Sequence, residues 1–252
     1  SVGMAIAAKW LSAKYDHSNS GICDSRVFAF CSDGDLMEGV GAEAASLAGH
    51  LGLNNLCWIY DDNKITIEGN TDLAFSENVA ERFHGLGWRV FEVEDANDLV
   101  AIHAAFEWFE QADKRPSLIC LRSVIGYGAP EKAGSHAAHG APLGPEEVRG
   151  AKRHYGWDEN QSFLVPEGVV EHFRETIGSR GGKAYQAWQE KLARFCESDS
   201  DAAAELSRIW SGELPPDWDS QIPEFPTDEK GMATRSSSGK VLNGVAGGIP
   251  WM

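Results

Sequence analysis

Two short apolar segments flank a longer segment rich in Ala, Leu and Glu, and this arrangement constrains the fold more than any other feature. Residues 26–31 read RVFAFC, a short apolar run typical of a strand covered on both faces, and residues 56–60 read LCWIY. The segment between them, LMEGVGAEAASLAGHLGL, predicts a helix that starts at Leu36 after a turn at SDGD. Strand, helix and strand in this order predict two parallel strands joined by a right-handed crossover.

Further apolar segments extend this pattern into one sheet. Strands are predicted at residues 88–93 (WRVFEV) and 116–125 (PSLICLRSVI), with an amphipathic helix at 97–111 between them. The chain also opens on a helical pattern, SVGMAIAAKWLSAKY. Alternating strands and helices predict an α/β fold with a doubly wound, mostly parallel sheet.

Composition changes along the chain predict three segments. Residues 1–144 hold the α/β pattern and end in GYGAPEKAGSHAAHGAPLG, a long loop rich in turn formers. Residues 145–231 carry helical patterns and then an extended linker rich in Pro and acidic residues. Residues 232–252 begin a further domain, and their last six residues, GGIPWM, are typical of a strand beginning. Because the chain opens without Met inside a helical pattern, we expect it to be a piece of a longer protein.

Charge, apolar content and cysteine usage exclude several classes of protein. The formal net charge of -16 repels nucleic-acid phosphates and anionic lipid headgroups, and Lys and Arg form no clusters. No apolar stretch approaches the ~20 residues that cross a bilayer. We therefore expect neither nucleic acid nor a membrane as a partner. The five cysteines, odd in number and without C-x-x-C spacing, indicate reduced, buried thiols of a cytoplasmic protein.

Polar residues follow the first two predicted strands. Asp33 comes just after the first strand, and Asn63 just after the second, in YDDNKITIEG. Because the carboxyl ends of adjacent parallel strands lie at one edge of a sheet, we expect these side chains to lie close together. With the carbonyl of Ile65 they offer the hard oxygen ligands that Mg²⁺ or Ca²⁺ requires. Gly34 and a helix starting at Leu36 would let backbone N–H groups meet a diphosphate. The alternative is that both segments are ordinary turns, since Asp, Asn and Gly are the usual turn residues.

These segments resemble those of the transketolase family. FCSDGDLMEG and, thirty residues later, YDDNKITIEG resemble its thiamine-diphosphate signature, which normally has a G-D-G triplet and a terminal Asn. EAASLAGHLGL, IGYG, AGSHAAHGAPLG and ATRSSSGK also resemble transketolase segments and follow the family's order, so the resemblance spans essentially the whole chain. One difference is Ser32 in place of the first Gly. If that position required a positive φ, Ser would strain the turn by about 1 kcal/mol or more.

The resemblance implies thiamine diphosphate as the cofactor, with Mg²⁺ or Ca²⁺. Asp33, Asn63 and the carbonyl of Ile65 match the metal ligands of the family. Gly34 matches a glycine whose backbone meets the diphosphate. The same positions are indicated, without the resemblance, by the polar residues that follow the first two predicted strands.

The resemblance implies further roles around the cofactor. Ile67 and Ile125 match apolar residues that pack on it. His139 matches a histidine that touches the diphosphate side of the cofactor and the ketose donor. Glu38 and Glu43 match acids at a dimer interface that are thought to communicate protons between two cofactors, which gives Glu38, with His139, a catalytic role.

Arg235 matches an arginine that binds the phosphate of a sugar phosphate, but each of these positions also has a simpler interpretation. A lone Arg in a linker is usually a solvated charge. Glu38 and Glu43 could be exposed residues of a helix, because their spacing does not place them on one stripe. His136 and His139 could form half of a zinc site, although no further Cys or His falls at ligand spacing.

The activity that the resemblance implies is transketolase activity, the transfer of a two-carbon ketol unit from a ketose phosphate to an aldose phosphate. It also implies a homodimer whose cofactor site is shared with the partner subunit's pyrimidine-binding domain. The acid that activates the aminopyrimidine ring belongs to that domain, so we expect this chain alone to be inactive. The alternatives are a dihydroxyacetone synthase-type ketol transferase and a non-catalytic module that binds thiamine diphosphate.

Overall fold

Four strands form one parallel sheet, as the apolar segments predict. The computed structural model describes residues 1–16, 21–111 and 114–252. The strands are β1 (Val27–Ser32), β2 (Leu56–Asp62), β3 (Arg89–Val93) and β4 (Ser117–Arg122). Their order in the sheet is β1-β2-β4-β3, and each neighbouring pair is parallel. The parallel α/β fold is confirmed, although β4 ends at Arg122 and not at the predicted Ile125.

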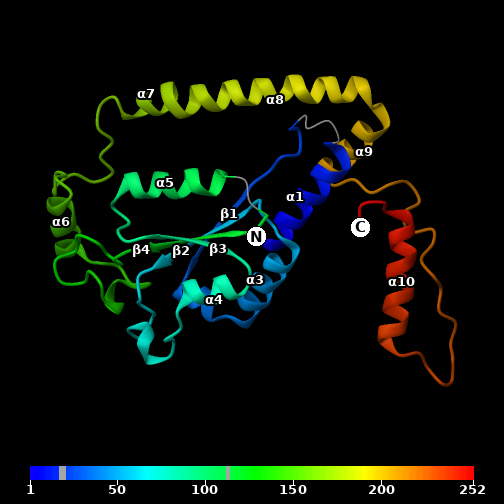
Figure 1. Cartoon of the computed structure of the whole chain (residues 1–252), viewed down its shortest axis with the longest axis horizontal. Coiled ribbons are helices and arrows are strands. Elements are labelled where there is room, and N and C mark those ends of the chain that lie inside the picture. The colour runs from blue at the N-terminus through cyan, green and yellow to red at the C-terminus, as the bar shows by residue number, and fades with distance from the viewer. Residues whose placement is uncertain (17–20, 112–113) are drawn as a thin grey trace. The chain divides into compact units, whose positions relative to one another are not determined.

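Helices cover both faces of this sheet, which makes it doubly wound (Figure 1). One face packs against α1 (Val2–Tyr15), α3 (Gly39–Leu51) and α4 (Val79–Gly85), and the other against α5 (Leu99–Glu110). On the first face the rings of Trp58, Phe83 and Trp88 contact one another. The buried indole N–H of Trp88 donates to the carbonyl oxygen of Ala45 in α3 at 2.9 Å. This aromatic cluster therefore fixes α3, the crossover helix, on the sheet.

The remaining elements are mostly helical. They are the helices α2 (Asp33–Met37), α6 (Pro145–His154), α7 (Val169–Phe173), α8 (Ser179–Ser198), α9 (Ser200–Ser211) and α10 (Thr234–Gly248), the 3₁₀ turns η1 (Thr71–Leu73) and η2 (His136–Ala138), and the π-helical turn η3 (Arg174–Gly178). Between α9 and α10 the chain runs through turns without helix or strand, as the predicted linker requires.

The predicted turn at SDGD and the predicted helix start at Leu36 are wrong. α2 begins directly after β1, and α3 begins only after Glu38, whose ψ of 131° separates the two helices. The cause is local. The backbone N–H and the hydroxyl of Ser32 both donate to the Asp35 carboxylate, at 2.8 and 3.0 Å, and this capping arrangement starts a helix immediately after the strand.

The expectation that residues 26–31 are covered on both faces is also wrong. β1 lies at the edge of the sheet, and Phe28 and Phe30 are 47% and 79% exposed. α5 contacts Phe28 through Phe106 and Phe109, whereas Phe30 extends beyond that contact. An apolar run therefore identified the strand correctly, but it did not show how much of each face is covered.

The predicted strand at GGIPWM is wrong, because its glycines end α10. A Cβ on Gly244 would lie 2.4 Å from the carbonyl oxygen of Gln221, and a Cβ on Gly248 would lie 2.1 Å from that of Trp218. These glycines therefore let a helix pack closely on the preceding segment, a role that the sequence does not distinguish from the start of a strand.

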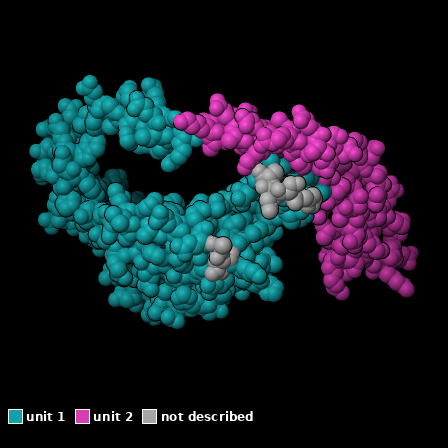
Figure 2. Space-filling view, turned by 45° about the horizontal axis from the view of Figure 1, so that its top comes forward, with its two compact units in different colours: residues 1–180 teal, residues 181–252 magenta. Residues whose placement is uncertain are grey.

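The chain divides into two compact units, residues 1–180 and residues 181–252 (Figure 2). The sheet lies in the first unit, and α9 and α10 lie in the second. The predicted segment limits at residues 144 and 231 stay a prediction. In the described part of the chain no helix is both long enough and apolar enough to span a bilayer.

The cysteines differ in burial. All five are free thiols: Cys23, Cys57 and Cys120 are buried, Cys31 is half-buried, and Cys196 is exposed on α8. The prediction of buried thiols is therefore wrong for Cys196. Burial raises the pKa of the Cys31, Cys57 and Cys120 thiols to about 12 and also raises that of Cys23. Because the thiolate is the nucleophile, these four should react slowly.

Alkylation by iodoacetamide at pH 8 is therefore expected to modify Cys196 alone while the chain is folded. Mass spectrometry should find one adduct on the native chain and five after unfolding in guanidinium. Cys196→Ser should remove the native adduct without changing the other four. Rapid addition of two or more adducts to the native chain would contradict the burial of the remaining thiols.

Candidate functional site

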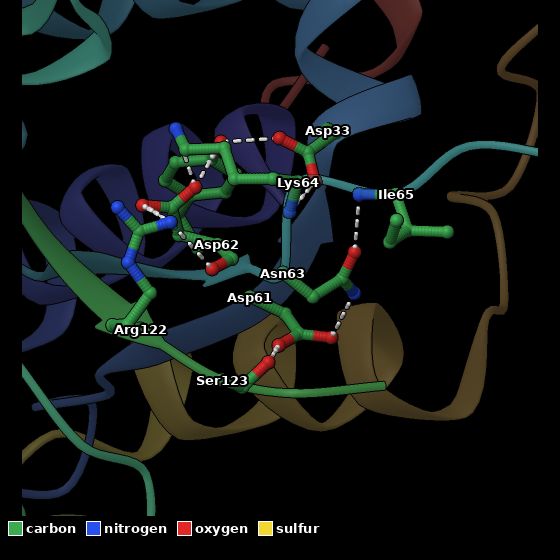
Figure 3. Close-up of polar contacts among 9 residues, drawn as sticks. Asp33, Asp61, Asp62, Asn63, Lys64, Ile65, Arg122 and Ser123 are labelled. Carbon is green, nitrogen blue, oxygen red and sulfur yellow. Dashed lines mark hydrogen bonds and ion pairs between the residues drawn. The ribbon is translucent and has the colours of Figure 1, made fainter. Parts of the chain in front are cut away.

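The carboxyl ends of β1 and β2 bring the proposed metal ligands together (Figure 3). Ser32 lies opposite Asp61 in the parallel register, so the residues that follow each strand meet at one edge of the sheet. Asp33, the first residue of α2, is only 1% exposed. Asn63 and Ile65 follow β2 and lie on the same side of the strand ends as Asp33 (Figure 3).

Asp33 accepts two hydrogen bonds from β2 and the turn after it. The hydroxyl of Tyr60 lies 2.5 Å from Oδ1, and the backbone N–H of Lys64 donates to Oδ2 at 3.1 Å. Lys64 has a φ of 61°, a left-handed conformation that is uncommon for a residue with a side chain. In this conformation its N–H points toward Asp33. Burial raises the pKa of Asp33, and the Tyr60 hydrogen bond opposes that shift. A cation would stabilise this buried carboxylate.

The amide of Asn63 is oriented by hydrogen bonds at both ends. Its Oδ1 accepts from the Ile65 N–H at 2.9 Å, and its Nδ2 donates to Asp61 Oδ2 at 3.1 Å. The hydroxyl of Ser123, just after β4, hydrogen-bonds to the other Asp61 oxygen. Asp61 therefore directs the amide nitrogen away from Ile65 and leaves the amide oxygen on the side of the turn.

A second carboxylate near Tyr60, that of Asp62, has ion pairs of its own. Oδ1 of Asp62 also lies 2.9 Å from the Tyr60 hydroxyl oxygen, and Asp62 forms ion pairs with Lys64 at 2.7 Å and Arg122 at 3.3 Å. Burial, with Asp33 as the second cause, raises the pKa of Tyr60, so its phenol is protonated. Sequence reasoning missed this network. The available signal was the Tyr that ends the buried run LCWIY, because a buried phenol hydroxyl needs a hydrogen-bond partner.

A cleft of about 460 Å³ opens beside this edge of the sheet. Gly34, Glu38, Ile65, Ile67 and His139 line it, together with Ser32, Asp35, Met37, Thr66 and Glu68. A Cβ on Gly34 would meet nothing within 4 Å, so the glycine leaves open space that a side chain would fill. The Nδ1 atom of His139 is buried and has no hydrogen-bond partner among the described residues. Such an atom indicates a group that a ligand would satisfy.

Within the first unit, the candidate residues Asp33, Asn63, Glu43 and Ile125 are not among those that line this cleft. Ile125 is half-buried in the turn after β4 and is not among the residues that line it. Glu43 is exposed on α3, and Glu38, which does line the cleft, is exposed between α2 and α3. Arg235 is exposed in the first turn of α10, in the second unit, and not in a linker.

Ser32 fits its position without strain. Its φ of -119° and ψ of -179° are extended values that any residue adopts. The conformational penalty considered for a serine at this position therefore does not arise. Its hydroxyl instead donates to Asp35 and helps to start α2.

The oxygen donors fit a hard cation better than zinc. In the part of the chain that the structure describes, no three His, Cys, Asp or Glu side chains form a metal-binding group, and His136 is exposed. One carboxylate, one amide oxygen and one backbone carbonyl would leave several positions of a Mg²⁺ or Ca²⁺ ion to be filled by ligand oxygens and water. The open space at Gly34 provides room for such a ligand.

Comparison with known proteins identifies a family for this chain. The family described as the thiamine diphosphate binding domain of transketolase matches residues 1–215. The chain is 45% identical over 249 residues to a transketolase of Geobacillus stearothermophilus and 44% identical over 252 residues to one of Bacillus subtilis. Each alignment covers 99% of this chain and 37% of the relative. This chain therefore spans about 37% of the length of these curated relatives.

Solved structures give the same result. A Pichia stipitis transketolase in complex with sedoheptulose-7-phosphate superposes with a TM-score of 0.89 at 38% identity. A transketolase from Leishmania mexicana superposes with a TM-score of 0.89 at 34% identity. Both comparisons cover 99% of this chain and 37% of the solved chain.

Proposed function

Because the chain belongs to the transketolase family and carries its thiamine-diphosphate-binding domain, we propose that it holds the diphosphate and metal of that cofactor in a ketol-transferring enzyme. The reaction is the transfer of a two-carbon unit from a ketose phosphate to an aldose phosphate. The observation that carries this proposal is the meeting of Asp33, Asn63 and Ile65 beside a cleft that Gly34 and His139 line.

The residues of this edge would share the binding of the cofactor. Asp33, Asn63 and the carbonyl of Ile65 would hold Mg²⁺ or Ca²⁺, and Gly34 would let the backbone approach the diphosphate. The metal would offset locally the net charge of -16, which opposes an anionic ligand. Ile67, exposed in the cleft, would pack on the apolar part of the cofactor.

Other residues would act around the reacting groups. The cofactor, when bound, supplies the carbanion chemistry through its thiazolium ring. His139 would donate a hydrogen bond to the diphosphate or to an oxygen of the ketose, because an imidazole ring carries at least one N–H donor. Ile125 would pack on the cofactor, and Arg235 would bind the substrate phosphate.

Assembly is part of the proposal. Glu38 and Glu43 are both exposed in the single chain. Residues that contact a second subunit in a dimer would likewise be exposed when one chain is considered alone. In a homodimer the partner's pyrimidine-binding domain would complete the cofactor site and supply the acid for the aminopyrimidine ring. The similar Pichia stipitis transketolase was solved in complex with a sugar phosphate, which supports the proposed substrate class.

Calorimetric titration of the chain with thiamine diphosphate tests the proposal. We expect weak binding in the presence of Mg²⁺ and no detectable binding in excess EDTA, because the diphosphate would be held through the metal. Thiamine, which lacks the diphosphate, should bind in neither condition. Equal binding with and without the chelator would contradict the metal-dependent site. A coupled ketol-transfer assay on this chain alone should show no turnover.

A further inference from the structure

Tyr60 connects the hydrophobic core to the proposed metal site. It lies in β2 between β1 and β4, opposite Cys31 on one side and Cys120 on the other. Its ring belongs to the buried cluster beneath α3, and the residue is 1% exposed. The position of its hydroxyl is therefore set by the packing of the sheet and not by a flexible loop.

The hydroxyl of Tyr60 lies between two carboxylates. Its oxygen is 2.5 Å from Asp33 Oδ1 and 2.9 Å from Asp62 Oδ1. A protonated phenol has one hydrogen, so it can donate to one of these carboxylates at a time. The role of the tyrosine therefore depends on which carboxylate accepts this hydrogen bond.

The surrounding charges favour donation to Asp33. Asp62 already has two cationic partners, Lys64 at 2.7 Å and Arg122 at 3.3 Å. Asp33 is more deeply buried, and its hydrogen bonds come from neutral donors, the Tyr60 hydroxyl and the Lys64 N–H. Removing a hydrogen-bond donor from a buried carboxylate costs more free energy than removing it from a carboxylate that ion pairs already neutralise.

We propose that Tyr60 is a positioning residue for the metal: its hydroxyl holds Oδ1 of Asp33 so that the carboxylate faces the cation in a fixed orientation. The proposal rests on the proposed function, because it assigns Asp33 to the metal. With Oδ1 held by Tyr60 and Oδ2 by the Lys64 N–H, the carboxylate plane cannot rotate freely, and each oxygen keeps a lone pair for a ligand. Donors that orient a metal ligand typically change metal affinity by about 10–100-fold when they are removed.

The test is Tyr60→Phe, which removes the hydroxyl and keeps the buried ring. Thiamine diphosphate binding is measured by calorimetry over a series of Mg²⁺ concentrations. We expect the Mg²⁺ concentration for half-maximal binding to rise about 10-fold or more, with the affinity for the cofactor restored at saturating Mg²⁺. Tyr155→Phe is the matched control. It also removes a tyrosine hydroxyl hydrogen bond, to the carbonyl of Tyr127 at 2.8 Å, and should leave the Mg²⁺ dependence unchanged.

A spectroscopic measurement separates positioning from general damage. With Mn²⁺ in place of Mg²⁺, the electron paramagnetic resonance spectrum of the bound ion reports its coordination geometry. Tyr60→Phe should alter that spectrum, whereas Tyr155→Phe should match the wild type. The proposal is overturned if Tyr60→Phe leaves both the Mg²⁺ dependence and the spectrum unchanged. It is also overturned if binding is lost together with thermal stability and saturating Mg²⁺ does not restore it. Failure of the wild-type chain to bind the cofactor with Mg²⁺ would instead refute the proposed function itself.

Discussion

Asp33→Asn is expected to lower the metal-dependent affinity for thiamine diphosphate by more than about 100-fold and to leave the fold intact. The lower limit comes from the groups that orient a metal ligand, because removing such a group alone lowers metal affinity by about 10–100-fold. A direct carboxylate ligand should contribute more, because it also brings a negative charge to the cation. Asparagine has the same shape, so the variant changes charge without leaving a cavity.

The hydrogen bonds around Asp33 can adapt to this substitution. The amide oxygen of an asparagine at position 33 can accept from the Lys64 N–H, as Oδ2 of Asp33 does. Its nitrogen can donate to the Tyr60 oxygen, and the Tyr60 hydroxyl can then donate to Asp62, which lies 2.9 Å away. Every buried polar group thus keeps a partner, so the substitution should cost little stability.

The pKa of Asp33 supports the same expectation for the metal-free chain. Burial raises this pKa, so the folded chain binds the proton more tightly than the unfolded chain does. Above the folded pKa the ionised carboxyl therefore lowers stability, and this loss is recovered as the pH falls through that pKa. Asp33→Asn removes the ionised form. At neutral pH without metal, the variant should be as stable as the wild type or slightly more stable.

Calorimetry with Mg²⁺ and urea unfolding with EDTA together test this prediction. Asp24→Asn is the charge-matched control, because Asp24 is exposed near the opposite end of β1 and should affect neither measurement. A variant Asp33→Asn that binds the cofactor as well as Asp24→Asn does would remove Asp33 from the metal site. A large loss of stability in EDTA would show instead that the carboxylate is structural.

The pairing of Asp33 with Asn63 could be predicted because it depends on topology. Apolar runs identified β1 and β2, parallel connection placed their carboxyl ends together, and the residues after each strand had to meet. The orientation of the two side chains could not be predicted in the same way. It depends on the Tyr60 hydroxyl and the Asp61 carboxylate, whose partners are set by packing across three strands.

Errors at the ends of elements have local causes that periodicity does not report. The hydrogen bonds from Ser32 to Asp35 start α2 earlier than the apolar pattern implies. The exposure of Phe30 has instead a tertiary cause, because β1 is an edge strand and its ring contacts with α5 are made by Phe28. Arg235 was considered as a residue of a linker, whereas it lies in the first turn of α10.

Gly49 gives a physical reason for one of the segments that resembles the transketolase family, EAASLAGHLGL. It lies in α3 where this helix passes the connection between α4 and β3. A Cβ on Gly49 would lie 1.8 Å from the carbonyl oxygen of Leu86 and 3.5 Å from the ring of Trp88. The first distance is to a backbone atom, which cannot turn away as a flexible side chain could. A side chain at this position would therefore force α3 away from the sheet.

Gly49→Ala is accordingly expected to destabilise the chain by about 3 kcal/mol, the upper part of the usual range for overpacked sites. Gly3→Ala is the control with the same chemical change. Gly3 lies in the first turn of α1, and a Cβ there would meet nothing within 4 Å, so alanine should stabilise the helix by less than the roughly 0.5–1 kcal/mol of a helix interior. Urea unfolding followed by circular dichroism should move the two midpoints in opposite directions. Equal midpoints for Gly49→Ala and the wild type would mean that α3 can shift without cost. The close approach of the helix to Leu86 would then not be the reason for glycine at this position.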